Sequence, residues 1–340
     1  MSESLVDQIR QGHRRALARL ITQLENEQPQ AQTTLSQLFS SSGQAHLVGI
    51  TGAPGTGKST LVAALASRYR RQGHTVAIVA VDPTSPFSGG AILGDRIRMQ
   101  GLAGDPGVFI RSLANRGHLG GLSRTTQDVV TVLDAAGFDL VLIETVGAGQ
   151  SEVEIARTAQ TVIVVDAPGL GDDIQAIKAG ILEIADIFVV NKADRPNAER
   201  TVASLKAMLE LGPAHQPSAW HHGQSLPLNL PTQSSPNTPW KIPVCKTVAH
   251  QGAGVAEVVS AITQHRAYLI ASGLLAQRDQ ARLQADLEAR LQTALLAQLQ
   301  AHLPADYLAD IMEKLVNRTV APYNAVQSIL DTYMQQVLKC

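Results

Sequence analysis

Short apolar runs alternate with amphipathic segments along the middle of the chain. The runs at 46–50, 75–81 and 138–143 are continuous and rich in β-branched residues, which is typical of strands buried on both faces. Further strands are expected at 107–113, 161–165, 187–190 and 244–247, and helices at 58–72, 125–136, 174–184, 198–211 and 255–270. This alternation predicts an α/β fold with a mostly parallel central sheet flanked by helices.

Both ends of the chain carry helical patterns instead. Apolar residues recur at helical spacing over 4–24, which predicts one amphipathic helix, and a second helix is expected at 33–39. From 272 onward the pattern is helical throughout, and Pro304 and Pro322 divide it into three helices. An apolar stripe follows the first of these, made of Leu283, Leu287, Leu291, Leu295, Leu299 and Leu303. Spacing alone leaves two roles open for this stripe, packing on the N-terminal helix and dimerisation with a second copy.

These patterns predict three parts, which are an N-terminal helical arm at 1–43, a central domain at 44–271 and a C-terminal helical dimerisation region at 272–340. Within the central domain, the stretch 212–243 holds seven of the 16 prolines. We expect this stretch to be a solvated insertion loop, because proline fits neither a helix interior nor a central strand.

Composition narrows the classes of function. The 340 residues carry a formal net charge of −1, which argues against nucleic acid as the main partner. No apolar stretch reaches the length of a membrane span, and the N-terminal segment lacks the apolar core of a signal peptide. The two cysteines, Cys245 and Cys340, are far apart and form no metal-spaced pair. We therefore expect a cytoplasmic protein without a membrane partner.

The most specific pattern joins the first strand of the central domain to its first helix. The segment GAPGTGKST comprises Gly52, Ala53, Pro54, Gly55, Thr56, Gly57, Lys58, Ser59 and Thr60. It is the phosphate-binding loop pattern, in which backbone N–H groups and a helix N-terminus converge on a phosphate. Lys58 is expected to reach the β- and γ-phosphates of a nucleotide, and the Ser59 hydroxyl to bind Mg²⁺.

A carboxylate and a glycine follow the strand expected at 138–143. Glu144 stands at the carboxyl end of this strand, and Gly147 comes three residues later. The carboxylate can hold a metal-bound water and the glycine N–H can meet the γ-phosphate, so together they can sense a triphosphate. Aspartate is the usual acid at this point, and Glu144 is one methylene longer.

The tetrapeptide NKAD follows the strand expected at 187–190. The Asp194 carboxylate can accept hydrogen bonds from guanine N1–H and the exocyclic amine, a pair of donors that adenine lacks. The Lys192 stem can pack over the purine, and the Asn191 amide can tie the loops together. After the last strand, Val248 and Ala249 are placed where a backbone N–H could contact guanine O6. This pattern favours GTP over ATP.

Together these motifs resemble the MeaB/ArgK family of GTPases. The similarity extends over about 10–330 and rests on GAPGTGKST, VDPTSPFSGGAILGDRIRM, RGHLGGL, LIETVGAGQSE, PGLGDDIQAIKAGILEIAD and NKAD. Members of this family act as chaperones of adenosylcobalamin-dependent acyl-CoA mutases, above all methylmalonyl-CoA mutase. The resemblance implies a homodimer through the C-terminal helices and slow GTP hydrolysis that the mutase stimulates. Hydrolysis would gate cobalamin loading or exchange and protect the mutase.

The resemblance also implies roles for single residues. Ser59, Asp82, Asp95 and Glu144 would form the Mg²⁺ and switch machinery, with Lys58, Asp82 and Glu144 acting in catalysis. The last guanine motif departs from the family pattern, because Thr247-Val248-Ala249 stands where Ser-Ala is commoner. The Ala249 backbone contact is kept there, and a serine hydroxyl is lost.

The loop from Asp166 to Lys178 corresponds to a third switch that meets the mutase. Its glycines and acidic residues favour a mobile, water-facing loop in the absence of a partner. We expect mutase binding to bring Lys178 to the γ-phosphate side and so to accelerate hydrolysis. The alternative is that Lys178 belongs to a solvated helix face.

Two other functions stay open on the sequence. A nickel metallochaperone GTPase would share this domain type, but it should carry Cys or His ligands beside the switches, where the sequence shows no such cluster. A small-molecule kinase would need an acceptor pocket next to the γ-phosphate, which a sequence does not reveal. Phosphate release measured with and without a purified mutase separates the three functions.

Overall fold

The structure, a computed structural model, describes residues 4–83, 99–102, 104–115, 124–145, 151–169, 184–211, 239–304 and 306–337. The chain divides into two compact units, Met1–Arg282 and Leu283–Cys340. The first unit holds the sheet, and the second consists of helices. Among the helices in these ranges, none combines the length and the apolar character of a bilayer-spanning segment.

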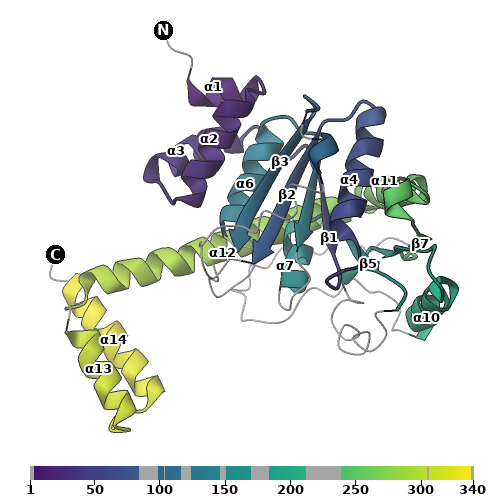
Figure 1. Ribbon diagram of the computed structural model, residues 1–340. Helices are drawn as coiled ribbons and strands as arrows, with labels where there is room; N and C mark the ends of the chain where they lie inside the picture. Colours follow the sequence, from purple (N-terminus) through teal and green to yellow (C-terminus); the bar gives the residue numbers. More distant parts are fainter. Residues whose placement is uncertain are drawn as a thin grey trace. The chain divides into compact units, whose positions relative to one another are not determined.

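Seven parallel strands form the sheet of the first unit (Figure 1). Their spatial order is β3-β2-β4-β1-β5-β6-β7, and every pairing between these strands is parallel. The strands are β1 (His46–Thr51), β2 (Val76–Pro83), β3 (Val108–Asn115), β4 (Leu140–Thr145), β5 (Thr161–Asp166), β6 (Ile187–Val190) and β7 (Val244–Lys246). The predicted α/β fold with a parallel sheet is confirmed.

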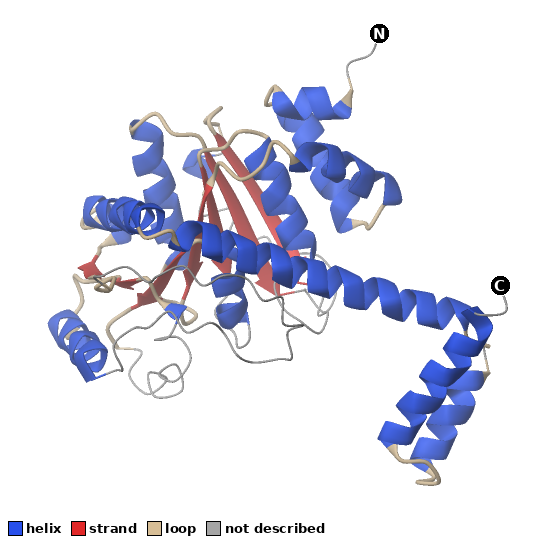
Figure 2. Cartoon of the chain, turned by 180° about the vertical axis from the view of Figure 1, so that it is seen from behind, coloured by secondary structure: helices blue, strands red, loops and turns tan. Residues whose placement is uncertain are grey.

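Helices cover both faces of this sheet (Figures 1 and 2). One face carries α4 (Lys58–Arg71) and α11 (Val255–Ala271), and the other carries α6 (Arg124–Ala135), α7 (Ser151–Thr158) and α10 (Ala198–Leu211). Successive residues of a strand point to opposite faces. On β2, Ala77 and Val79 therefore join the apolar layer under α6, while Val76 and Ile78 join the layer under α4. Burial on both faces explains why the strands read as continuous apolar runs.

The N-terminal arm consists of α1 (Leu5–Arg10), α2 (Arg14–Glu25) and α3 (Pro29–Phe39), and α2 and α3 pack on α6. The single helix expected at 4–24 is wrong. The chain turns between α1 and α2 at Gly12, whose φ of 77° is a left-handed conformation that glycine adopts without steric cost. The next helix begins at Pro29, earlier than expected, because proline suits the first turn of a helix.

The C-terminal part contains the three expected helices, α12 (Leu274–His302), α13 (Tyr307–Val316) and α14 (Pro322–Val337). Within the second unit α13 and α14 pack together, and the Tyr307 hydroxyl donates to the Ser328 carbonyl at 3.0 Å. Most of the leucine stripe on α12 is exposed, with Leu287 at 62% and Leu295 at 53%. These apolar side chains have no cover within the described chain.

The first turns of α12 belong to the sheet-containing unit. Two nitrogens of Arg278 donate to the carboxylate of Asp186 at 2.9 Å each, and Asp186 directly precedes β6. Burial works against the charge on Asp186, but Arg278 and His265 outweigh burial and hold the pKa of this carboxyl below its usual range. The division between the two compact units lies inside α12, between Arg282 and Leu283. The domain boundary at 271/272 stays a prediction.

A buried polar network continues from Asp186 along the amino ends of the strands. His265 on α11 places Nε2 3.2 Å from Asp186 Oδ1 and Nδ1 2.9 Å from the hydroxyl of Thr161. The same hydroxyl lies 2.8 Å from Nε2 of His46, the first residue of β1. The indole N–H of Trp240 donates to the Asp186 carbonyl at 2.8 Å. The network holds α11 and the start of α12 to the sheet.

Trp240 corrects part of the expectation for the proline-rich stretch. Residues 212–238 lie outside the described part of the chain, but Trp240 packs its ring 4.9 Å from the ring of His265. Residues 239–243 form a loop with Pro239 and Lys241 exposed, and the partly buried Trp240 side chain departs from the expected solvated loop.

The buried His46 should make the stability of the folded chain depend on pH. Burial, together with Arg266 and His265, lowers the pKa of His46 to about 3. As the pH falls below about 6.5, His46 becomes protonated in the unfolded chain but stays neutral in the folded chain. The contribution of neutral His46 to the free energy of unfolding is therefore complete above that pH and decreases toward pH 3. We expect His46→Gln to make the free energy of unfolding fall less steeply below pH 6, by up to about 1.4 kcal/mol per pH unit.

Urea unfolding at a series of pH values measures this slope. The exposed His13→Gln is the matched control and should retain the slope of the unchanged protein. Equal slopes for His46→Gln and His13→Gln would show that His46 titrates normally in the folded chain.

Candidate active site

Four expected motifs meet at the carboxyl edge of the sheet. The phosphate loop follows β1, Glu144 is the next-to-last residue of β4, Asn191 follows β6 and Thr247 follows β7. Because the strands are parallel, their carboxyl ends lie at one edge, which is where open α/β sheets bind ligands.

At two positions of the phosphate loop only glycine fits, because there is no room for a Cβ atom. A Cβ at Gly52 would stand 2.0 Å from the carbonyl oxygen of Val165, and one at Gly57 would stand 2.4 Å from Nδ2 of Asn191. Both glycines also have left-handed φ values, 137° and 92°. Helix α4 begins directly after Gly57 and has no side-chain cap, so its first N–H groups can serve an anion.

The Lys58 side chain curves back over the phosphate loop. Its ammonium group donates to the carbonyl oxygens of Gly52 and Ala53 at 2.8 and 3.0 Å, and the residue is 7% exposed. These contacts hold a positive charge beside the loop.

Ser59 and Glu144 form a close pair between α4 and β4. The Ser59 hydroxyl donates to Oε1 of Glu144 at 2.6 Å, and both residues are buried. A hydroxyl and a carboxylate are hard oxygen donors of the kind that Mg²⁺ prefers. The longer side chain of Glu144 still reaches Ser59, so the pair fits a Mg²⁺ ion as two neighbouring ligands.

Asn191 joins the phosphate loop to the last guanine motif. Its Nδ2 donates to the Thr56 carbonyl at 2.9 Å, while its Oδ1 accepts from the Thr247 hydroxyl at 3.0 Å and from the Ala249 N–H at 3.1 Å. One buried side chain therefore sets the positions of both loops.

The rest of NKAD lies beside this junction. Lys192 has a left-handed φ of 57°, and its ammonium group donates to the carbonyl of Gly55. The Ala193 N–H donates to the Thr247 carbonyl at 3.0 Å, and Asp194 is exposed. Lys192 thus lies across the top of the phosphate loop while the Asp194 carboxylate faces solvent.

Some predicted site residues, or their side chains, lie outside the described part of the chain. Asp95, Gly147 and Lys178 lie outside the described residues, and the side chain of Asp82, near the end of β2, is also outside them. Thr60 lies in the first turn of α4, and Val248 forms an antiparallel bridge with Ala253.

Other polar groups at this edge were not predicted. Thr247 supplies a hydroxyl to Asn191 one residue before the position where the serine is lost, and Thr145 donates to Thr51 at 3.1 Å between the ends of β4 and β1. Burial raises the pKa of Asp166 at the end of β5 above its usual range, although the Ala167 N–H donates to its carboxyl. For Thr247 and Thr145, the position of a threonine at the end of a strand is the sequence feature that could have indicated these contacts.

A family model described as the methylmalonyl-CoA mutase-associated GTPase MeaB matches residues 17–303. The chain belongs to this family. The resemblance inferred from the motifs is thereby confirmed, and the phosphate loop, the acid at the end of β4 and the NKAD segment all fall inside the matched range.

Relatives of this MeaB-family chain carry related names. A protein of Pyrococcus horikoshii named as a GTPase is 44% identical over 97% of this chain and 97% of its own. GTPase ArgK of Escherichia coli is 38% identical over 80% of this chain and 78% of its own. The mitochondrial methylmalonic aciduria type A homolog of Mus musculus is 32% identical over 80% of this chain and 64% of its own.

A crystal structure described as a LAO/AO transport system kinase has the same fold. Its TM-score is 0.67 at 28% identity, over 97% of this chain and 96% of that one. The family and this fold agree on a P-loop GTPase architecture.

Proposed function

We propose that this chain is a Mg²⁺-dependent GTPase that acts as a chaperone of an adenosylcobalamin-dependent acyl-CoA mutase, methylmalonyl-CoA mutase in the first place. GTP hydrolysis would gate loading or exchange of the cobalamin cofactor and protect the mutase. The observation that carries the enzymatic part is the junction at Asn191, which joins a phosphate loop to a guanine motif. The mutase part rests on the description of the family and on the mouse relative's name.

The described residues suggest how the site acts. The phosphate loop and the N-terminus of α4 bind the phosphates, and Lys58 offsets the negative charge that develops on the transferring phosphoryl group. Ser59 and Glu144 would hold Mg²⁺, which when bound neutralises phosphate charge. Asp194 selects guanine. The Ala249 N–H is held by Asn191, in the same NKAD segment. Lys178 remains our candidate for the residue that the mutase repositions.

Phosphate release from GTP and from ATP, with no acceptor present, tests the enzymatic part. We expect release from GTP only, and only with Mg²⁺. Nucleoside diphosphate formation that requires an added small-molecule acceptor, with the phosphoryl group recovered on that acceptor, would favour the kinase instead.

Glu144→Ala should raise the Mg²⁺ concentration needed for the half-maximal rate of hydrolysis, by about tenfold. The variant takes from Ser59 its neighbouring ligand and removes a carboxylate that attracts the cation. Glu210→Ala, which removes an exposed carboxylate from α10, is the matched control. A Mg²⁺ dependence that Glu144→Ala leaves unchanged would overturn the assignment of this acid.

The exposed leucine stripe supports a homodimer through the C-terminal helices. Leu287 and Leu291 are 62% and 46% exposed, and a second copy could bury them. We expect light scattering to give a dimer for the full chain and a monomer for Leu287→Asp/Leu291→Asp. Gln298→Asp, at an exposed polar position on α12, should remain dimeric. A monomeric full chain at micromolar concentration would contradict this assembly.

A further inference from the structure

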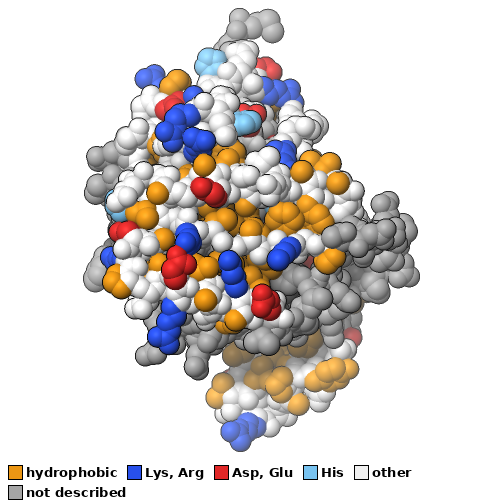
Figure 3. Space-filling view, turned by 90° about the vertical axis from the view of Figure 1, so that its right-hand side faces the viewer, with side chains coloured by type: hydrophobic (Ala, Val, Ile, Leu, Met, Phe, Trp, Pro, Cys, Tyr) orange, Lys and Arg blue, Asp and Glu red, His pale blue; other side chains and the backbone are white. Residues whose placement is uncertain are grey.

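A basic pocket lies behind the last guanine motif, on the face of the sheet that carries α4 and α11. Its volume is about 300 Å³, which is at the lower end for small-molecule sites. Ala64, Ser67, Arg68 and Arg71 line it from α4. The residues 249–252, together with Val255 and Ala256, line it from the other side. Figure 3 shows basic, acidic and apolar side chains interspersed over this side of the molecule.

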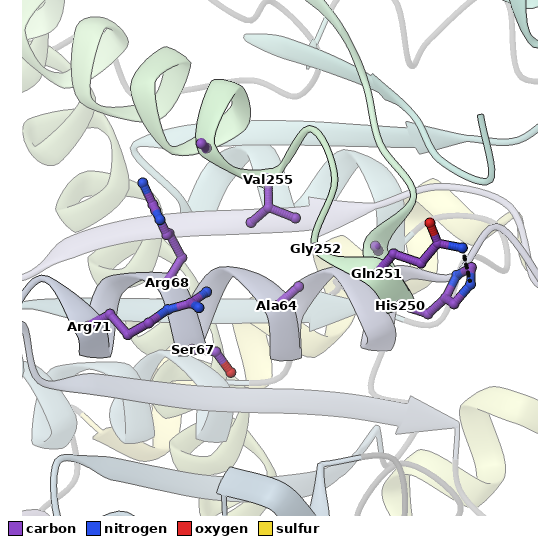
Figure 4. A pocket seen from close by; sticks show the side chains of 10 residues that line it. Ala64, Ser67, Arg68, Arg71, His250, Gln251, Gly252 and Val255 are labelled. Atoms are coloured by element: carbon purple, nitrogen blue, oxygen red, sulfur yellow. Dashed lines mark hydrogen bonds between the residues drawn. The ribbon is translucent and has the colours of Figure 1, made fainter. Parts of the chain in front are cut away.

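The charge of the lining residues has one sign. Arg68 and Arg71 stand one turn apart on α4, His250 lies across from them, and none of the ten described lining residues is acidic. In Figure 4, Arg68 reaches from α4 toward α11 and Arg71 lies along α4, while His250 and Gln251 stand at the other end. A pocket of this kind attracts an anion.

The neighbouring Arg70 shows what these arginines lack. Arg70 donates to both carboxylate oxygens of Asp105, at 2.9 to 3.1 Å. Arg68 and Arg71 form no ion pair with any residue in the described ranges, and Nε of Arg68 is buried without a hydrogen-bond partner there. Buried polar groups are rarely left without a hydrogen-bond partner, so we expect a bound ligand to supply an acceptor for the Nε–H of Arg68.

The start of α11 adds to the same attraction. This 17-residue helix begins at Val255, and its N-cap Gly254 offers no side chain to the first N–H groups. Val255 and Ala256 line the pocket, so the positive end of the helix dipole lies at its edge. Arginine forks and helix N-termini both match phosphate oxygens.

We propose that this pocket binds a small phosphate-bearing molecule and that its occupancy is linked to guanine-nucleotide binding. The link, which rests on the proposed function, passes through the turn from Ala249 to Gly252. That turn forms one side of the pocket, and its Ala249 N–H is held by Asn191 in the candidate active site. A ligand that shifts this turn changes both sites, and binding linkage is reciprocal.

Calorimetric titration of the full chain with inorganic phosphate, in excess Mg²⁺ and GDP at constant low ionic strength, tests the site. Saturating GDP fills the α- and β-phosphate positions of the phosphate loop, and any phosphate that binds at the γ-position binds alike to the unchanged protein and to the pocket variants. We expect saturable binding that Arg68→Gln/Arg71→Gln weakens at least about tenfold and that Arg71→Gln alone weakens less. Arg200→Gln/Lys206→Gln, which removes two exposed charges from α10, should bind as the unchanged protein does. Thermal unfolding of each variant confirms that it is folded.

Three outcomes would overturn the proposal. They are no phosphate binding at millimolar concentrations, equal binding by the pocket variant, and tighter binding of malonate than of phosphate, which would make the ligand a carboxylate. The comparison between unchanged and variant proteins holds whether or not GDP binds, so it fails separately from the proposed function. The linkage has its own readout, the rate of GDP release, which phosphate should change in the unchanged protein and leave constant in the pocket variant. A release rate insensitive to phosphate in both would overturn the linkage.

Discussion

Lys58→Ala should lower the rate of GTP hydrolysis by about 10²–10³-fold, the loss typical for one preorganised donor to a developing charge. The ammonium group of Lys58 is held against the carbonyls of Gly52 and Ala53, beside the position that the phosphate loop offers to the β- and γ-phosphates. Alanine removes this charge, and water in its place stabilises the transferring phosphoryl group less well.

Single-turnover phosphate release at saturating GTP and Mg²⁺ measures this loss. Lys206→Ala, at an exposed position on α10, is the matched control and should hydrolyse GTP at the unchanged rate. Thermal unfolding of Lys58→Ala shows whether the loop keeps its shape without the two hydrogen bonds. A folded Lys58→Ala within about threefold of the unchanged rate would contradict the role of Lys58 in the phosphate loop.

Asp194→Asn should weaken GDP binding by roughly a hundredfold or more, equal to a few kcal/mol. An amide cannot accept from both guanine N1–H and the exocyclic amine, and its own NH₂ opposes the amine. Xanthine carries a carbonyl in place of that amine, so the variant should gain affinity for xanthosine diphosphate. The gain separates a change of base recognition from simple damage to the site.

Calorimetry with GDP, xanthosine diphosphate and ADP makes this comparison. The unchanged protein should bind GDP far more tightly than ADP, and Asp331→Asn, an exposed change on α14, should behave in the same way. Equal affinity of the unchanged protein for GDP and ADP would refute guanine recognition by Asp194.

The sheet could be predicted because its physical causes are local. The central strands β1, β4, β5 and β6 are buried on both faces, so their apolar runs are visible in the sequence. Their parallel direction follows from the helices that connect successive strands. The break at Gly12 was missed because one glycine inside an amphipathic pattern costs a helix only about 1 kcal/mol, and tertiary packing decided against the helix.

The motifs of the site were visible for the same reason, since phosphate and guanine contacts require particular residue types at fixed spacing. Contacts between distant segments were not visible. The bond from Thr247 to Asn191 spans 56 positions, and the one from His46 to Thr161 spans 115. Trp240 was misjudged because its neighbours are prolines, whereas its partner His265 lies on another element.

The rate of phosphate release from GTP by the full chain, measured while adenosylcobalamin-dependent methylmalonyl-CoA mutase is titrated in, tests the central claim most directly. An equal concentration of an unrelated protein serves as the control for crowding, and Lys178→Ala tests the coupling residue. The account predicts a saturable increase of about tenfold or more with GTP, none with ATP, and a blunted increase for Lys178→Ala. A rate that stays constant over the whole titration, in a preparation that hydrolyses GTP, would contradict the role as a mutase chaperone.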